Sequence, residues 1–124
     1  MAADRSLPRS ERLRTLGAVR RLFSEGESGF VYPFRYLWFA ESDTMPSVEV
    51  LFSVPKRYHK RANRRNLLRR RTKEAYRLQK ELLAPRIGTT NLDLALIYSS
   101  ADILPATKIA HAVRKILETV AADL

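Results

Sequence analysis

The pattern of apolar and polar residues predicts strands in three stretches of the chain. Residues 29–40 (GFVYPFRYLWFA) are rich in aromatic and β-branched side chains, and Pro33 is expected to divide them into a short strand and a longer one. Residues 47–54 alternate one set of side chains (Val48, Val50, Phe52 and Val54) with another (Glu49, Leu51 and Ser53). Residues 92–98 are apolar almost throughout, which is typical of a central strand covered on both faces.

Helical spacing of apolar residues predicts a helix near each end of the chain. The first is expected from Thr15, which can cap its start, to Glu25, and Gly26 ends it. Its apolar stripe consists of Leu16, Val19 and Phe23, with Leu22 beside them. The last helix opens at Pro105 and packs on the sheet through Ile109, Ala112, Val113, Ile116, Leu117 and Val120.

A third helix is predicted between Pro55 and Pro85, because proline disfavours helix before it and does not continue one. At 100° per residue, one side of this helix is suited to a core and consists of Leu68, Thr72, Ala75, Gln79, Leu82 and Leu83. The opposite side is polar and cationic and consists of Asn66, Arg69, Arg70, Lys73, Arg77 and Lys80. The segment 86–91 that follows is expected to be a loop.

The order of elements is α-β-β-β-α-β-α, which predicts an α+β fold of two layers with a small mixed sheet of about four strands. Strands 47–54 and 92–98 are expected to be parallel, since a helix connects them, and such crossovers are ordinarily right-handed. Residues 1–124 are expected to form one domain, with residues 1–14 as a flexible basic arm.

Positive charge is concentrated in residues 56–80, which hold 12 of the 23 Lys and Arg residues and a single acid, Glu74. The segment therefore carries +11, while the whole chain carries +10. A solvated helix face would mix both signs to gain ion pairs, and this one does not. The pattern indicates a binding site for a polyanion, most simply a nucleic acid.

The sequence has few of the side chains and motifs that enzymes use for catalysis. The chain has no Cys, so it offers no thiol nucleophile and no thiolate metal ligand. Its two histidines lie far apart: His59 is expected to contact RNA at the surface, and His111 to be exposed on the last helix. The glycine-rich, HExxH and GxSxG motifs are absent, and no apolar run reaches the ~18 residues of a membrane span.

Residues 65–74 (RNLLRRRTKE) resemble the signature Arg-Asn-Arg-x-Lys-Arg-x-x-Arg-Glu of the bacterial ribonuclease P protein component. The signature is matched by Arg65, Asn66, Arg70 and Glu74, and conservatively by Arg69 and Lys73. Leu67 departs from it, since the family has a second Arg there. Arg71 stands one helical turn later, which suggests that the missing charge has moved along the same flank.

The resemblance implies a left-handed crossover in place of the ordinary one. It also implies that a catalytic RNA subunit uses Mg²⁺ to remove the 5′ leader of precursor tRNA, while the protein binds both RNAs, supplies no catalytic residue and holds no cofactor or metal. We expect a cytoplasmic protein, because the sequence has no Cys, no membrane span and no apolar signal core at residues 1–13, and we expect it to be monomeric without RNA and not to bind membranes. The expected RNA contacts are Lys56, Arg57, Lys60, Arg61, Arg64, Arg65, Asn66, Arg69, Arg70, Arg71, Lys73 and Arg77.

The resemblance further implies a cleft for the single-stranded leader, expected here at Phe23, Phe34, Tyr36 and Trp38. Phe23 matches an aromatic position of the family, whereas Val19 stands at a second one; core packing is the alternative for Phe23. The strand after Pro33 has apolar bulk on both faces, one with Phe34, Tyr36, Trp38 and Ala40, the other with Arg35, Leu37 and Phe39. Either one face is exposed to RNA, or helices cover both.

Two other functions use the same cationic helix. A ribosomal or RNA-chaperone protein would bind RNA without a leader cleft. A DNA-binding regulator would place the helix in a major groove, but the helix-turn-helix spacing and dimer interface expected of one are not evident in the sequence.

Overall fold

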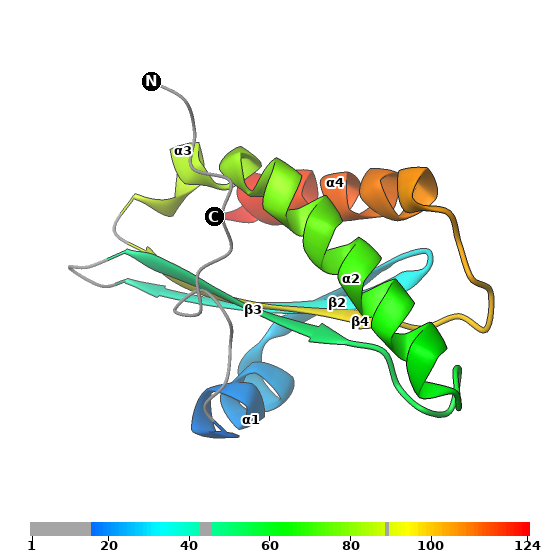
Figure 1. Cartoon of the computed structure of the whole chain (residues 1–124). Helices are drawn as coiled ribbons and strands as arrows, with labels where there is room; N and C mark the ends of the chain where they lie inside the picture. The colour runs from blue at the N-terminus through cyan, green and yellow to red at the C-terminus, as the bar shows by residue number, and fades with distance from the viewer. Residues whose placement is uncertain (1–15, 43–45, 89) are drawn as a thin grey trace.

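A four-stranded sheet separates helices on its two faces. The computed structural model describes residues 16–42, 46–88 and 90–124. Strands β1 (Glu27–Val31), β2 (Phe34–Ser42), β3 (Ser47–Ser53) and β4 (Thr90–Tyr98) lie in the order β1-β2-β4-β3. Helices α2 (Ala62–Gln79) and α4 (Ala106–Asp123) cover one face, and α1 (Leu16–Glu25) lies against the other (Figure 1). The predicted α+β fold and order of elements are confirmed, but α1 adds a further layer to the two expected.

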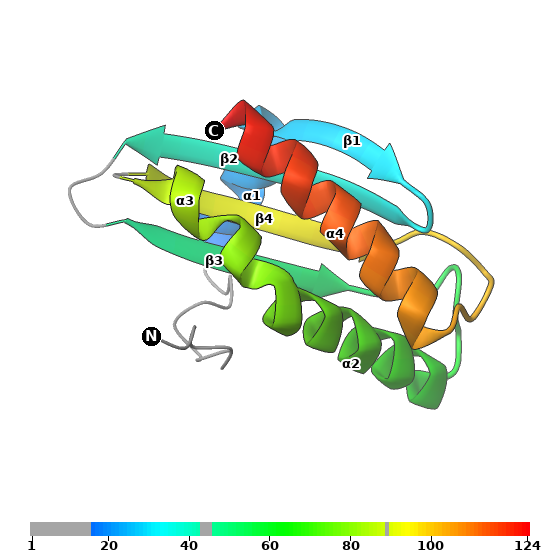
Figure 2. The same cartoon turned by 90° about the horizontal axis from the view of Figure 1, so that it is seen from above.

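The sheet is mixed, as predicted. β1 and β2 form an antiparallel hairpin around Tyr32 and Pro33, β2 pairs antiparallel with β4, and β3 pairs parallel with β4. In Figure 2, α2 lies on the viewer's side of the sheet. Consider an observer on the α2 side of the sheet who looks along the chain direction of the parallel strands β3 and β4. This observer sees β4 to the left of β3. The crossover is therefore left-handed, as the resemblance implied and against the ordinary preference.

The main core lies between the sheet and the helices α2 and α4. It contains fully buried side chains from the sheet, α2 and α4, among them Phe34, Leu68, Leu94 and Ile116, and it includes the whole predicted stripe of α4. A smaller core under α1 joins Leu22, Leu37, Ala95 and Ile97. β4 supplies side chains to both cores, which explains its nearly continuous apolar sequence.

The helical segments differ from the predicted boundaries. α2 begins at Ala62, because residues 56–61 form a turn-rich loop in which the amides of Tyr58 and His59 donate to the carbonyl of Pro55. Pro85 does not stop α2: after a 3-10 turn at Lys80–Leu82, it lies in the first turn of α3 (Ala84–Ile87). The expected loop at 86–91 is therefore shorter, because α3 includes Ile87 and β4 begins at Thr90.

Gly26 ends α1 as predicted. Its amide donates to the carbonyl of Leu22 at 3.0 Å, and a Cβ atom at this position would lie 2.4 Å from that carbonyl oxygen. The chain can therefore turn into β1 only with glycine here. The expected arm at 1–14 and the expected cap Thr15 lie outside the described residues. A search of the described residues finds no helix that is long and apolar enough to cross a membrane.

Candidate nucleic-acid interface

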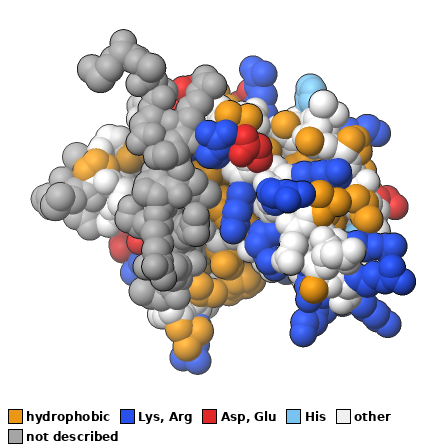
Figure 3. Space-filling view, viewed as in Figure 1, with side chains coloured by type: hydrophobic (Ala, Val, Ile, Leu, Met, Phe, Trp, Pro, Cys, Tyr) orange, Lys and Arg blue, Asp and Glu red, His pale blue; other side chains and the backbone are white. Residues whose placement is uncertain are grey.

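The cationic segment, residues 56–80, forms a continuous surface made of the loop after β3 and the outer side of α2. Lys56, Arg57, Lys60 and Arg61 are exposed in the loop. On α2, Arg64, Asn66 and Arg70 are exposed, and the half-buried members are Arg65, Arg69, Arg71, Lys73 and Arg77. Figure 3 shows Lys and Arg side chains gathered over this part of the surface. The structure thus brings the twelve expected RNA contacts together.

The inner side of α2 packs as its spacing predicts. Leu68, Thr72 and Ala75 are buried, and the hydroxyl of Thr72 donates to the carbonyl of Leu68 at 2.8 Å, which satisfies it inside the core. Tyr76, which the predicted inner side did not include, is also buried and meets Phe52 edge-on at 5.7 Å. A rigid, well-packed helix therefore carries the outer cations.

Arg65 joins α2 to the loop before it. Its Nη1 donates to the carbonyl of His59 at 3.0 Å and to that of Lys60 at 2.7 Å. His59 is itself buried, since its Nε2 lies 2.8 Å from the carbonyl oxygen of Ser100 and its ring packs near Tyr98. The expectation that His59 is a surface RNA contact is therefore wrong, because this hydrogen bond ties it to the end of β4. His111 is exposed on α4, as expected.

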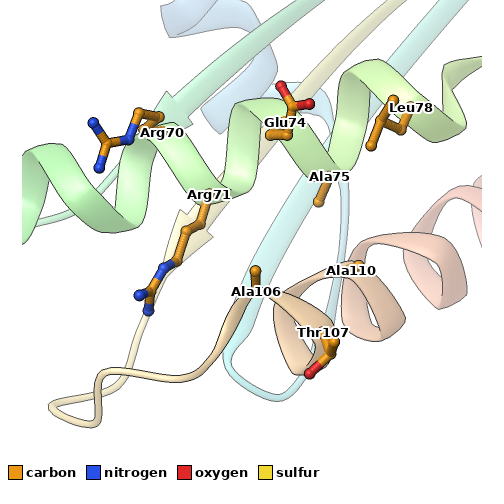
Figure 4. A pocket seen from close by; sticks show the side chains of 8 residues that line it. All are labelled: Arg70, Arg71, Glu74, Ala75, Leu78, Ala106, Thr107 and Ala110. Carbon is orange, nitrogen blue, oxygen red and sulfur yellow. The ribbon is translucent and has the colours of Figure 1, made fainter.

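Arg71 does not reach back toward Leu67. Its Nη1 donates at 2.7 Å to the carbonyl of Leu104, in the connection between β4 and α4 (Figure 4). Leu67 itself is half-buried. The idea that Arg71 replaces the missing charge along the same flank is corrected, because this guanidinium is held by the neighbouring connection.

We expect Arg71→Leu to lower the free energy of unfolding by about 1 kcal/mol, because the Leu104 carbonyl loses its charged donor. Denaturant unfolding of this variant measures that loss. Arg70→Leu is the matched control, because Arg70 is exposed and donates no hydrogen bond within the described part of the chain. Equal stability of the two variants would contradict a role for the Arg71 contact.

A shallow groove runs between α2 and α4. Its volume is about 460 Å³, and it is lined by Ala75, Leu78, Ala106, Thr107 and Ala110, with Arg70, Arg71 and Glu74 at its border (Figure 4). Glu74 accepts hydrogen bonds from Arg77, one of them at 3.1 Å, and these lower the pKa of Glu74. The acid of the cationic segment is thus paired within its own helix.

The face of β2 that was assigned to the leader cleft is covered by α2 and α4. Phe34 is fully buried, Tyr36 is 7% exposed, and Trp38 packs half-buried against the same core. The assignment of Phe34, Tyr36 and Trp38 to the cleft is therefore corrected. Both faces of β2 are apolar because helices cover both, with α1 on the second.

Phe23 lies on the exposed side of α1. It is 48% exposed, whereas its neighbour Leu22 is fully buried, so the core alternative applies to Leu22 and not to Phe23. Arg21 and Phe23 are separated by 200° around the helix and point to opposite flanks. Arg21 contacts Glu41 and Asp93, where β2 ends and β4 begins. Phe23 therefore faces the other end of the sheet, where β3 ends and the cationic loop begins.

The end of the sheet near Arg21 is negatively charged and closed by ion pairs. Nη2 of Arg21 lies 3.2 Å from Glu41 and 3.6 Å from Asp93, and its guanidinium stacks 4.9 Å from the centre of the Phe39 ring. Burial raises the pKa of Asp93, and Arg21 opposes that rise. Phe39 lies on the α1 face of β2 with Leu37, and it is not among the residues expected in the leader cleft. Its ring is half-buried under Arg21.

Comparison with known proteins identifies relatives of one family. A protein-family model described as ribonuclease P matches residues 7–121. A ribonuclease P protein component from Chlorobaculum tepidum is 34% identical over 129 residues, covering 90% of this chain and 83% of that protein. One from Porphyromonas gingivalis is 38% identical over 78 residues, covering 62% of this chain and 57% of that protein, so the match spans little more than half of that relative.

Solved structures of similar fold carry the same description. An RNase P protein from Thermotoga maritima superposes with a TM-score of 0.68 at 21% identity, covering 88% of this chain and 96% of that one. An RNase P protein from Staphylococcus aureus gives a TM-score of 0.66 at 14% identity, covering 90% and 96%. At these identities the two structures support the fold, and the sequence relatives support the family.

Proposed function

The chain belongs to the ribonuclease P protein family, and on that premise we propose that it is the protein subunit of a ribonucleoprotein that removes the 5′ leader from precursor tRNA. In this role the RNA subunit performs the hydrolysis with bound Mg²⁺. The protein binds the catalytic RNA and the leader, and it works in the cytoplasm. Without RNA it is a monomer.

The observation that carries this proposal is the cationic segment on the outer side of a rigid helix. Its +11 charge lies on the loop before α2, on α2 itself and on Lys80 just after it, and the inner side of α2 is buried. Such a surface attracts phosphates without reading sequence and releases condensed counterions when it binds them. Neutralising the repulsion between two RNAs raises substrate affinity and favours metal binding to the RNA.

The leader is proposed to lie on the α1 face of the sheet. Phe23 offers an exposed ring there, on the flank of α1 that points toward the cationic loop. Bases of any sequence stack on such a ring, while the loop cations bind the phosphates. This location replaces the face of Phe34, Tyr36 and Trp38, which is buried.

The test compares precursor tRNA with mature tRNA, using holoenzyme assembled from the catalytic RNA and purified protein. Phe23→Ala should reduce the preference for the precursor several-fold or more, because a stacked base contributes about 1–3 kcal/mol. Its melting temperature should change little, since the ring is 48% exposed. A variant with unchanged preference at both low and high salt would contradict the proposed leader contact.

The RNA that the protein binds in cells distinguishes the proposed function from the ribosomal or chaperone alternative. Sequencing the RNA that co-purifies with the tagged protein should return one long structured RNA with ribonuclease P activity, together with precursor tRNAs. Recovery of ribosomal RNA alone would contradict the proposed function.

A further inference from the structure

One row of side chains crosses the whole sheet on the α1 face. Phe30 of β1 is paired with Arg35 of β2, Arg35 with Ile97 of β4, and Ile97 with Ser53 of β3. Paired residues share a face, so these four side chains, here called the outer row, point to the same side as Leu37 and Ala95 under α1. With a strand spacing of about 4.8 Å, the outer row is about 14 Å long.

The outer row begins at the cationic loop. Ser53 is the last residue of β3, and the loop with Lys56 and Arg57 follows directly. The flank of α1 that carries Phe23 points toward the outer row, because the opposite flank carries Arg21 to Asp93 at the other end of the sheet. A strand of RNA held by the loop and by Phe23 is therefore directed along this row.

The far end of the outer row combines an aromatic ring with a cation. Phe30 is 59% exposed on an edge strand, and Arg35 opposite it is also exposed. Single exposed apolar residues are ordinary, but an exposed ring beside a guanidinium provides both contacts that one nucleotide needs, a stacking surface and a phosphate ligand. Asp102 accepts a hydrogen bond from Tyr32 at 2.7 Å, and its charge disfavours phosphates past the end of the hairpin.

We propose that Phe30 and Arg35 form a second subsite for the leader, which binds a nucleotide farther from the cleavage site than the one at Phe23. The inference rests on the proposed function and adds the path of the leader across the sheet. It also provides a second stacking ring in a chain that has Val19 where its relatives are expected to have an aromatic residue. The occupant is single-stranded RNA, because the ring, the guanidinium and the adjoining loop are together complementary to it.

The experiment measures the affinity of the assembled holoenzyme for two precursor tRNAs, one with a leader of about two nucleotides and one with a leader of about ten. The short leader ends before the second subsite, and the long leader reaches it. Phe30→Ala should weaken binding of the long leader at least about five-fold, the lower end of one stacked base, and leave the short leader unchanged. Phe30→Trp, which keeps an aromatic ring at this position, should bind the long leader as tightly as the unchanged protein does. Arg35→Ala should make the logarithmic salt dependence shallower by about 0.7 for the long leader alone.

Leu78→Ala is the matched control, because Leu78 is a 41% exposed apolar residue in the groove between α2 and α4. This variant should change the affinity for neither precursor tRNA. If Phe30→Ala lowers the affinity for both leaders equally, or for neither, the second subsite is overturned. An unchanged affinity is also the result expected if Phe30 contacts a protein instead of RNA. If Phe23→Ala still reduces the preference for precursor, only the subsite fails. If Phe23→Ala is also silent, the proposed leader contact fails with it, and the RNA that co-purifies with the protein decides separately whether the proposed function stands.

Discussion

Replacing Arg69, Arg70 and Lys73 together with Ala should weaken binding of the catalytic RNA and of precursor tRNA by the largest factor of any surface change. If each side chain contacts one phosphate, the slope of log affinity against log salt should become shallower by about two, at roughly 0.7 per contact for single strands. The fold should remain, because the three residues lie on α2 opposite its buried side of Leu68, Thr72 and Ala75. Titrations at several salt concentrations measure the slope.

A triple variant of α4 is the matched control. Lys108, Arg114 and Lys115 are also exposed cations on a helix over the same face of the sheet. Their replacement with Ala removes the same formal charge from a surface outside the cationic segment. An equal change of slope in both triple variants would show that net charge alone, and not the position of α2, determines RNA binding.

Leu22→Ala should lower the free energy of unfolding by about 2–5 kcal/mol, the range for a fully buried leucine. Leu22 lies at the centre of the small core with Leu37, Ala95 and Ile97, and this core holds α1 on the sheet. The loss combines the lost burial of the side chain with the cost of the cavity that it leaves. Chemical denaturation with circular dichroism measures the loss.

Phe23→Ala provides the control for the same helix. The two residues are adjacent, but one side chain is fully buried and the other is about half exposed. We expect a large stability loss with Leu22→Ala and a small one with Phe23→Ala. The reverse order would mean that α1 is rotated about its axis, and Phe23 would then no longer face the leader.

The sequence predicted the fold wherever one periodicity determined one face. The stripe of α4 and the inner side of α2 were both found by counting at 100° per residue, because each helix is covered on a single side. β2 was different, since Phe34, Tyr36, Leu37 and Phe39 place apolar bulk on both faces. Period two identifies two faces, but only the packing of the helices shows which one is buried deeper.

The start of α2 illustrates a different limit. The predicted helix was bounded only by Pro55 and Pro85, and nothing in the spacing of residues 56–61 marks a later start. The loop is instead held by His59, whose partner Ser100 is 41 residues away, and by Arg65. Such long-range contacts leave no periodic trace, and for the same reason the buried state of His59 and the partner of Arg71 were not predictable.

The contact of Arg65 with the carbonyls of His59 and Lys60 also affects the thermodynamics of association. A loop rich in long cationic side chains would ordinarily lose much conformational freedom when it binds a polyanion, and this loss opposes affinity. Here the backbone of the loop is anchored to α2 by Arg65 and to β4 by His59 before any ligand arrives. The interface is therefore preorganised, and the loop backbone should keep the same conformation in the free protein and in the ribonucleoprotein.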